Sequence, residues 1–197
     1  MLEVELKSVV DDVERRRAAI EAAGATLVFS GRLEDRRYDT TERTLRADDQ
    51  VLRVRVYRDA SGSRAELNWK GRTRREDGYK LRDELETKVE DGDTLVAILD
   101  KLGYVLTIEI DREITQYDLD GTMIRFERYP RMDTLVEVEG TSEKIEAAIA
   151  ALGMPREGFT SERLLDFATR YEARTGALAA LSYASLAEGG GFDPANA

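Results

Sequence analysis

Strict alternation of apolar and polar residues marks several short segments of this chain. Residues 2–7 (LEVELK) and 51–57 (VLRVRVY) alternate at every position, which is typical of strands with one buried face. Five further segments rich in Val, Ile, Tyr and Thr are also predicted as strands: 65–70, 80–89, 108–117, 122–129 and 135–139. Short turns separate several of them, so the pattern favours an antiparallel sheet or barrel.

Other segments have the spacing of helices. These are residues 11–23, 93–102, 142–152 and 161–175, each followed directly by a glycine that favours a helix end. After Gly176 the composition shifts to Ala, Ser and Gly. We therefore expect one α+β domain over residues 1–176 and a flexible Ala- and Gly-rich tail over residues 177–197.

Charge is abundant, and its balance is acidic. Charged residues make up 36% of the 197 residues, and 30 Lys and Arg against 40 Asp and Glu give a net charge of −10. A net-acidic protein is a poor binder of nucleic acid or of anionic membranes. The first ten residues lack the features of a signal peptide, and no apolar run approaches the roughly 18–20 residues that cross a bilayer. We therefore expect a cytoplasmic protein.

The chain contains neither cysteine nor histidine. Disulfides, thiol chemistry and histidine-based catalysis are therefore excluded, and any bound metal must have oxygen ligands. Such ligands favour Mg²⁺, Mn²⁺ or Ca²⁺ over zinc or copper. The common phosphate-binding glycine loops and the EF-hand loop are also absent from the sequence.

The polar positions of the predicted strands are mostly charged. Glu3, Glu5 and Lys7 share one face of the first strand. The same holds for Arg53 and Arg55, for Asn68 and Lys70, for Arg82, Glu84 and Glu86, for Arg125 and Glu127, and for Glu137 and Glu139. One interpretation is a half-solvated sheet with a polar outer face and no site.

The alternative is a barrel whose interior is charged. Two inward carboxylates about 4 Å apart repel by roughly 4 kcal/mol at an effective dielectric near 20, so they require cations nearby. In that interpretation the acidic rows hold a divalent metal and the basic rows hold a polyphosphate.

Five motifs, in this order along the chain, resemble the CYTH family of triphosphate tunnel metalloenzymes. They are Glu3-Val4-Glu5-Leu6-Lys7 (ExExK), Leu52-Arg53-Val54-Arg55 (LRxR), Trp69-Lys70-Gly71, Arg82-Asp83-Glu84 and Glu137-Val138-Glu139 (ExE). The resemblance covers residues 2–175 and implies a closed, eight-stranded antiparallel barrel with flanking helices around a polar tunnel. The family includes class IV adenylyl cyclases, thiamine triphosphatases and inorganic triphosphatases.

The resemblance also implies roles for individual residues. It assigns Mg²⁺ or Mn²⁺ to Glu3, Glu5, Glu137 and Glu139, and the phosphate oxygens to Lys7, Arg53, Arg55, Lys70 and Arg82. Glu3, Glu5, Lys7, Arg53, Arg55 and Lys70 are the candidate catalytic residues. Glu84 and Glu127 are candidates for supporting carboxylates behind the ligands.

One departure from the family pattern concerns a basic pair. Where the family commonly has Lys-x-Arg, this chain has Ile110-Asp111-Arg112, which supplies Arg112 alone. Arg125 shares a face with Glu127 and is a candidate to compensate. We expect Arg36 and Arg37 in a loop or strand end, on the solvated surface.

These observations leave several functions open. The leading one is metal-dependent hydrolysis of an inorganic or organic triphosphate. An alternative is a class IV adenylyl cyclase that converts ATP to cyclic AMP and pyrophosphate, and a further one is a non-catalytic polyphosphate or nucleotide sensor. The expected partner is a small triphosphate (ATP, thiamine triphosphate or inorganic triphosphate), with no nucleic acid and no membrane, and the family suggests a homodimer.

Overall fold

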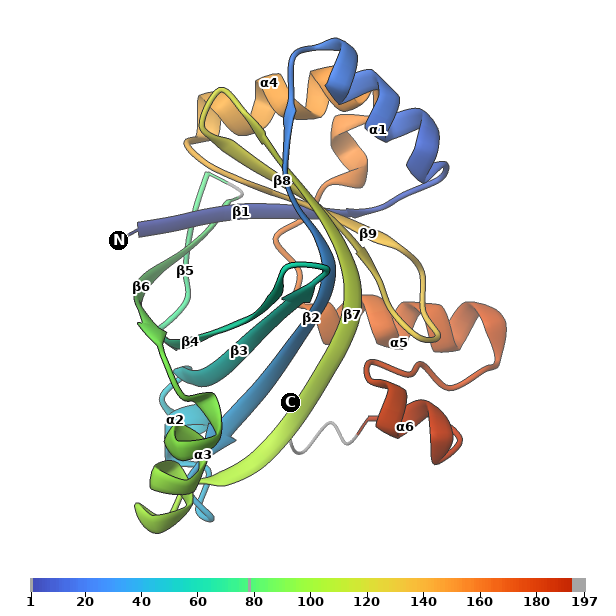
Figure 1. Cartoon of the computed structure of the whole chain (residues 1–197). Coiled ribbons are helices and arrows are strands. Elements are labelled where there is room, and N and C mark those ends of the chain that lie inside the picture. Colours follow the sequence, from blue (N-terminus) through green and yellow to red (C-terminus); the bar gives the residue numbers. More distant parts are fainter. Residues whose placement is uncertain (1, 78, 193–197) are drawn as a thin grey trace.

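The chain folds around one continuous sheet (Figure 1). The computed structural model describes residues 2–77 and 79–192, and the side chains of Leu2, Glu3 and Lys80 lie outside the described part. The strands are β1 (Leu2–Val9), β2 (Thr26–Asp39), β3 (Val51–Asp59), β4 (Gly62–Lys70), β5 (Arg74–Glu76), β6 (Tyr79–Val89), β7 (Val105–Leu119), β8 (Thr122–Arg128) and β9 (Leu135–Glu139). The helices are α1 (Val13–Ala22), α2 (Thr44–Ala47), α3 (Gly92–Lys101), α4 (Ser142–Leu152), the 3₁₀ turn η1 (Arg156–Gly158), α5 (Leu164–Thr175) and α6 (Tyr183–Ala187). Each helix in this part of the chain is too short or too polar to span a membrane.

The sheet closes into a barrel. Neighbouring strands follow the order β1-β9-β8-β7-β2-β3-β4-β6, and β6 pairs with β1 to complete the ring. Every pairing is antiparallel, with Val4 opposite Leu81 at the closing seam and Leu6 opposite Val138 on the other side of β1. β5 extends the sheet beyond β6. This architecture confirms the predicted α+β fold with a closed eight-stranded antiparallel barrel.

Most of the apolar core lies outside the barrel, between its wall and the helices. Leu6, Ile124 and Val138 point outward from β1, β8 and β9 and pack with Ile20 of α1 and Ile145 of α4. Figure 1 shows these two helices side by side over that part of the wall. Because successive residues of a strand face opposite sides, the residues between the apolar ones must point into the barrel. The alternative of a solvated polar sheet is therefore wrong.

Part of the expected flexible tail packs on the barrel. Ala179, Ala180 and Leu181 are buried, the last of them beside Phe167 of α5. The amide of Asp111 in β7 donates to the Leu181 carbonyl at 2.8 Å, and Ala180 exchanges two backbone hydrogen bonds with Arg131. The segment is therefore held by backbone pairing over residues 180–181 and continues into α6. Residues 193–197 of the expected tail lie outside the described residues.

The long strand β2 was not predicted, and its location corrects the expectation for Arg37. Arg36 is on the outer face, within 4 Å of Glu34 and Glu109, but Arg37 lines the interior. The outer face of β2 also carries Arg32, whose Nε donates to Asp111 at 2.6 Å. Because both faces of the strand are charged from residue 34 onward, the alternation of apolar and polar residues disappears there.

Candidate active site

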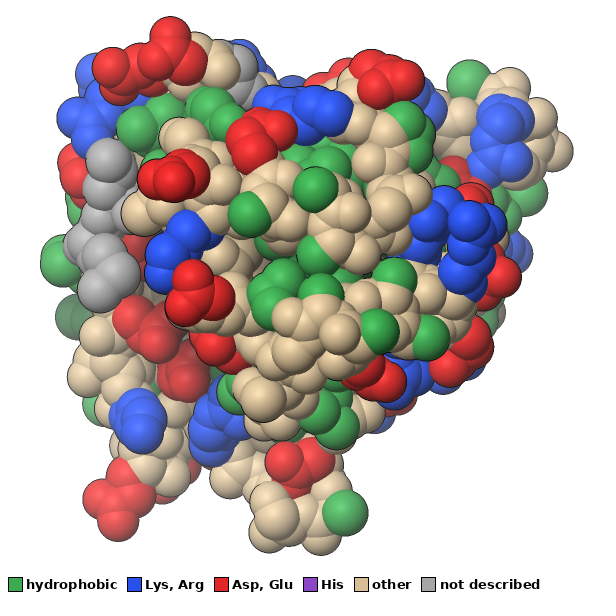
Figure 2. Space-filling view, turned by 90° about the horizontal axis from the view of Figure 1, so that it is seen from above, with side chains coloured by type: hydrophobic (Ala, Val, Ile, Leu, Met, Phe, Trp, Pro, Cys, Tyr) green, Lys and Arg blue, Asp and Glu red, His purple; other side chains and the backbone are tan. Residues whose placement is uncertain are grey.

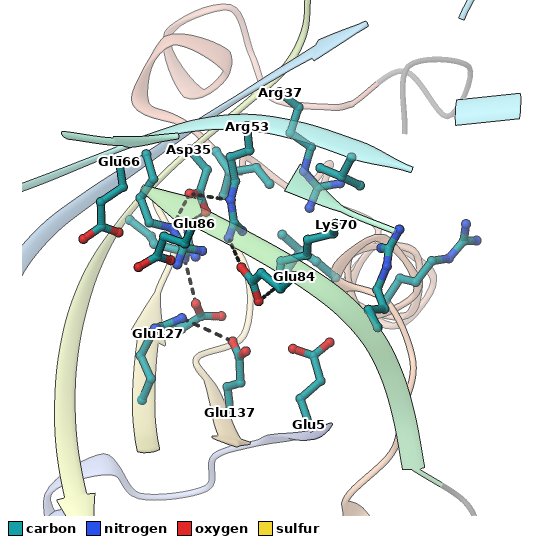
Figure 3. Close-up of a pocket in the computed structure, with 18 of the residues that line it drawn as sticks. Glu5, Asp35, Arg37, Arg53, Glu66, Lys70, Glu84, Glu86, Glu127 and Glu137 are labelled. Carbon is teal, nitrogen blue, oxygen red and sulfur yellow. Dashed lines mark hydrogen bonds and ion pairs between the residues drawn. The ribbon is translucent and has the colours of Figure 1, made fainter. Parts of the chain in front are cut away.

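The barrel encloses a cavity of about 660 Å³ (Figure 3). Twelve Lys and Arg and ten Asp and Glu are among the described residues that line it. The cavity therefore has a small excess of positive charge, whereas the chain as a whole has ten more acidic than basic residues. Figure 2 shows an outer face where acidic and basic side chains are interspersed. An anion is thus attracted to the interior more than to this face.

A pair of buried carboxylates forms one side of the cavity. Glu5 of β1 and Glu137 of β9 are 4% and 6% exposed, and both are near the Lys7 ammonium, whose Nζ lies 3.1 Å from Glu5 and 3.5 Å from Glu137. Glu139, opposite Glu5 in the β1–β9 register, also lines the cavity. Burial raises the pKa of Glu137, and the charges of Glu5 and Glu127 raise it further against the attraction of Lys7. This side of the cavity is short of positive charge.

These carboxylates fit a hard divalent cation in chemistry. Their oxygens are the ligands that Mg²⁺ and Mn²⁺ prefer, and the raised pKa of Glu137 reflects like charges that a cation would neutralise. Among the side chains that the structure describes, no group of three acidic residues is arranged closely enough to hold a metal ion. Lys7 stands between Glu5 and Glu137 and supplies the positive charge there. The Glu3 side chain, predicted as a fourth ligand, lies outside the described part.

Three arginines surround a buried aspartate in the middle of the cavity. Asp35 of β2 is 2% exposed, and its carboxylate accepts from Arg55 Nε at 2.8 Å and from Arg112 Nη1 at 2.8 Å. Arg53 Nε lies 3.6 Å away. Burial opposes ionisation of Asp35, yet the charges of Arg55, Arg53 and Arg112 hold its pKa well below the usual range. One carboxylate thus orients three guanidinium groups toward the cavity.

A second carboxylate, Glu127 of β8, helps to hold Arg112 in place. Glu127 accepts from Arg112 Nε at 2.9 Å and from the Tyr129 hydroxyl at 2.7 Å. Its burial is outweighed by the charges of Arg112, Arg125 and Lys7, so its pKa is lowered. Arg125 donates to Gln116 at 3.0 Å and lies 3.7 Å from Glu137. Glu127 and Asp35 together fix the orientation of Arg112.

The wall formed by β4 and β6 carries the predicted residues Lys70 and Arg82, and Arg64 of β4 also lines the cavity. Lys70 Nζ lies 3.2 Å from Glu84, which is also 3.6 Å from Arg53 Nη2. Arg82 donates to the backbone carbonyls of Gly71 and Asp49, both at 2.6 Å. Arg82 therefore holds the loop after β4 close to the segment that follows α2.

Sequence reasoning missed Asp35 and Arg37, the inward residues of the unpredicted strand β2. The guanidinium of Arg37 faces the cavity, and among the described residues its buried Nε has no hydrogen-bond partner. Burial and the nearby charges of Arg53, Arg112 and Arg82 lower the pKa of Arg37 to about 10, against the attraction of Asp35. Phe29, Leu33, Asp35 and Arg37 lie an even number of positions apart, so they share one face of an extended strand. This shared parity was the available signal for the strand.

The structure brings together every predicted site residue whose side chain it describes. All of these line the one cavity: Glu5, Lys7, Arg53, Arg55, Lys70, Arg82, Glu84, Arg112, Arg125, Glu127, Glu137 and Glu139. The placement agrees with the charged-interior interpretation, and the individual roles stay predictions.

Comparisons with known proteins give the same fold. The family described as the CYTH domain matches residues 1–152. A solved structure of a putative adenylate cyclase from Vibrio parahaemolyticus is similar with a TM-score of 0.73 and 17% identity, covering 86% of this chain and 98% of that one. The PH1819 protein from Pyrococcus horikoshii OT3 has a TM-score of 0.71 and 22% identity, covering 85% and 98%.

A third solved structure is that of a putative adenylyl cyclase from Hippeastrum, described as having a dominant triphosphatase activity. It is similar with a TM-score of 0.57 and 17% identity, covering 91% of this chain and 98% of that one. At these identities the solved structures show a shared fold. No curated protein matches the chain.

Proposed function

Because this chain belongs to the CYTH domain family, we propose that it is a divalent-metal-dependent enzyme that hydrolyses a triphosphate. The observation that carries the proposal is one cavity with buried carboxylates on one side, Glu5 and Glu137, and a group of arginines held by Asp35 on another. Glu137 has a raised pKa beside Glu5 and Glu127, and Arg37 has a lowered pKa beside three other arginines. A polyphosphate with a bound divalent cation supplies the missing charge to both sides at once.

The carboxylate side would hold the metal. Glu5, Glu137 and Glu139, together with Glu3, provide only oxygen ligands, and Mg²⁺ or Mn²⁺ bound there would neutralise phosphate oxygens and lower the pKa of a water molecule. Lys7 partly balances these carboxylates. If a bound cation neutralised them, the Lys7 ammonium would be available to a phosphate oxygen.

The basic residues of the cavity would bind and orient the phosphates. Arg53, Arg55 and Arg112 are held in place by Asp35, so their donors are oriented before the substrate arrives. Positioning and charge neutralisation dominate phosphoryl chemistry, and bidentate guanidinium groups suit phosphate oxygens. Lys70 and Arg125, on opposite walls, would contact the same anion, and Arg82 would act mainly by holding the Gly71 carbonyl.

A second candidate is the class IV adenylyl cyclase. A volume of about 660 Å³ lies within the range of roughly 300–1,000 Å³ typical of small-molecule sites, so the cavity has room for more than a bare triphosphate. Two of the similar solved structures named above are described as putative adenylate or adenylyl cyclases. The two reactions differ in whether water or the ribose hydroxyl attacks phosphorus.

Product identification separates the candidates. Purified protein, freed of metal with EDTA, is incubated with ATP, thiamine triphosphate and inorganic triphosphate, each with Mg²⁺ or Mn²⁺. Orthophosphate release from a triphosphate supports the phosphatase, and cyclic AMP from ATP supports the cyclase. If tripolyphosphate with Mg²⁺ binds and stabilises the protein but no substrate is converted, the chain is a sensor. If it neither binds nor is converted, the proposal fails.

A further inference from the structure

One cavity-lining position of the β7 wall carries no charge. Position 110, two residues before Arg112 and on the same face of β7, is an isoleucine. Ile110 is 2% exposed and packs beside Tyr129 and Leu165, so this part of the β7 wall is apolar. A phosphate bound near Arg112 therefore has no partner from that position.

The neighbouring strand carries a basic residue beside this gap. In the β2–β7 register Asp35 lies opposite Ile110, and Arg37 lies opposite Ile108. Arg37 is thus a diagonal neighbour of Ile110 on the inward face, and diagonal neighbours are roughly 7–8 Å apart, within reach of a long side chain. An arginine on β2 can therefore place its guanidinium in the space that a longer side chain at position 110 would use.

We infer that Arg37 is a phosphate-binding residue that serves the part of the cavity next to the uncharged position 110. The inference rests on the proposed function, because it assigns a further contact within the same site. The buried Nε of Arg37 has no hydrogen-bond partner among the described residues, although most buried polar groups in proteins have one. An anion in the cavity would accept from it, and Arg37 would complete the ring of donors that Arg53 and Arg112 begin.

The position of Arg37 also indicates which part of the ligand it contacts. In Figure 3, Arg37 enters the cavity from the side opposite Glu5 and Glu137. A polyphosphate anchored at the carboxylates must extend across the cavity to meet this guanidinium. Arg37 should therefore matter more for a chain of three phosphates than for pyrophosphate, which favours triphosphate over shorter anions.

The test uses Arg37→Gln with tripolyphosphate and pyrophosphate as probes. Kd is measured by calorimetry in EDTA, where no turnover occurs, and KM and kcat are measured with Mg²⁺. Loss of one charged hydrogen bond predicts a Kd and KM for tripolyphosphate about 10- to 100-fold higher, with a smaller change for pyrophosphate and in kcat. Arg37→Lys, which keeps the charge, should recover part of this loss.

Stability separates a binding role from a structural one. Burial and the neighbouring arginines disfavour the charge of Arg37, so the Tm of the Arg37→Gln protein should be unchanged or higher. The matched control is Arg36→Gln, which changes the adjacent outward arginine and should leave both Kd values unchanged. A wild-type Kd in Arg37→Gln, or a lowered Tm without a change in Kd, overturns the inference. If wild-type protein binds no tripolyphosphate with EDTA or Mg²⁺, the proposed function itself fails.

Discussion

Replacing Asp35 with asparagine tests how the cavity balances its charges. The carboxylate has three arginines within 3.6 Å, and at an effective dielectric near 20 each pair about 4 Å apart attracts by roughly 4 kcal/mol. The gross attraction is therefore on the order of 10 kcal/mol, and burial of the carboxylate cancels much of it. Removal of one partner from a buried ion pair typically costs about 3–5 kcal/mol, so we expect Asp35→Asn to lose that much stability.

The assay is urea unfolding at pH 7 in EDTA, with and without tripolyphosphate. Asp35→Asn removes the anion that competes with the substrate for Arg53, Arg55 and Arg112, while the asparagine oxygen still accepts from an arginine and helps to keep the group oriented. Tripolyphosphate should therefore bind this variant more tightly than wild type. A ligand at 100 times its Kd adds about 2.7 kcal/mol to the free energy of unfolding. At a fixed concentration of tripolyphosphate the variant should therefore gain more stability than wild type does.

Asp111→Asn is the matched control for this experiment. Asp111 is also 2% exposed and also accepts from an arginine, Arg32, but it lies on the outer face of the barrel. Its substitution should lower stability and leave the gain from tripolyphosphate as in wild type. The reasoning about Asp35 is refuted if Asp35→Asn costs less than about 1 kcal/mol, or if both variants respond equally to tripolyphosphate.

Three further predictions concern the metal side, the response to acid and the C-terminal segment. Glu5→Gln should abolish Mg²⁺-dependent turnover with little change in Tm, because Glu137 still pairs with Lys7 and the repulsion between Glu5 and Glu137 is removed. Unchanged turnover would remove Glu5 from the metal site. The pKa of Asp35 is lower in the folded protein than in the unfolded chain, so its contribution to stability is complete above about pH 5 and is lost as the pH falls. Urea titrations at decreasing pH should therefore show the unfolding free energies of wild type and Asp35→Asn converging. Leu181→Ala should lower the free energy of unfolding in urea by about 2–4 kcal/mol because Leu181 is 4% exposed. Leu178→Ala, at a position 54% exposed, should lower it by less than about 0.5 kcal/mol. Equal losses would mean that the segment does not pack in solution.

The sequence predicted the interior well wherever a strand has one apolar face. Val54 and Val136 point toward the helices, so the parity of each strand assigns Arg53 and Glu137 to the cavity. The same reasoning failed for β2, because its outer face is covered by ion pairs such as Arg58 Nε with Glu34 at 2.8 Å. Without an apolar outer face the alternation is lost from Glu34 onward, and the parity of Phe29 and Leu33 was the remaining signal that Arg37 points inward.

The C-terminal segment shows a different limit of sequence composition. Small residues such as Ala179 and Ala180 are typical of flexible tails, yet here both are fully buried. Their small size allows the backbone to approach Arg131 closely enough for two hydrogen bonds, at 3.2 and 2.8 Å. Composition alone does not distinguish a low-complexity tail from a segment that packs on the barrel.

The separation of the apolar core from the barrel interior has an evolutionary consequence. Side chains such as Leu6 and Val138 stabilise the fold from outside the wall, so inward positions can exchange one charge for another without repacking that core. A scaffold of this kind can change most of its sequence while its shape persists, as in the Pyrococcus protein that shares 22% of its residues at a TM-score of 0.71.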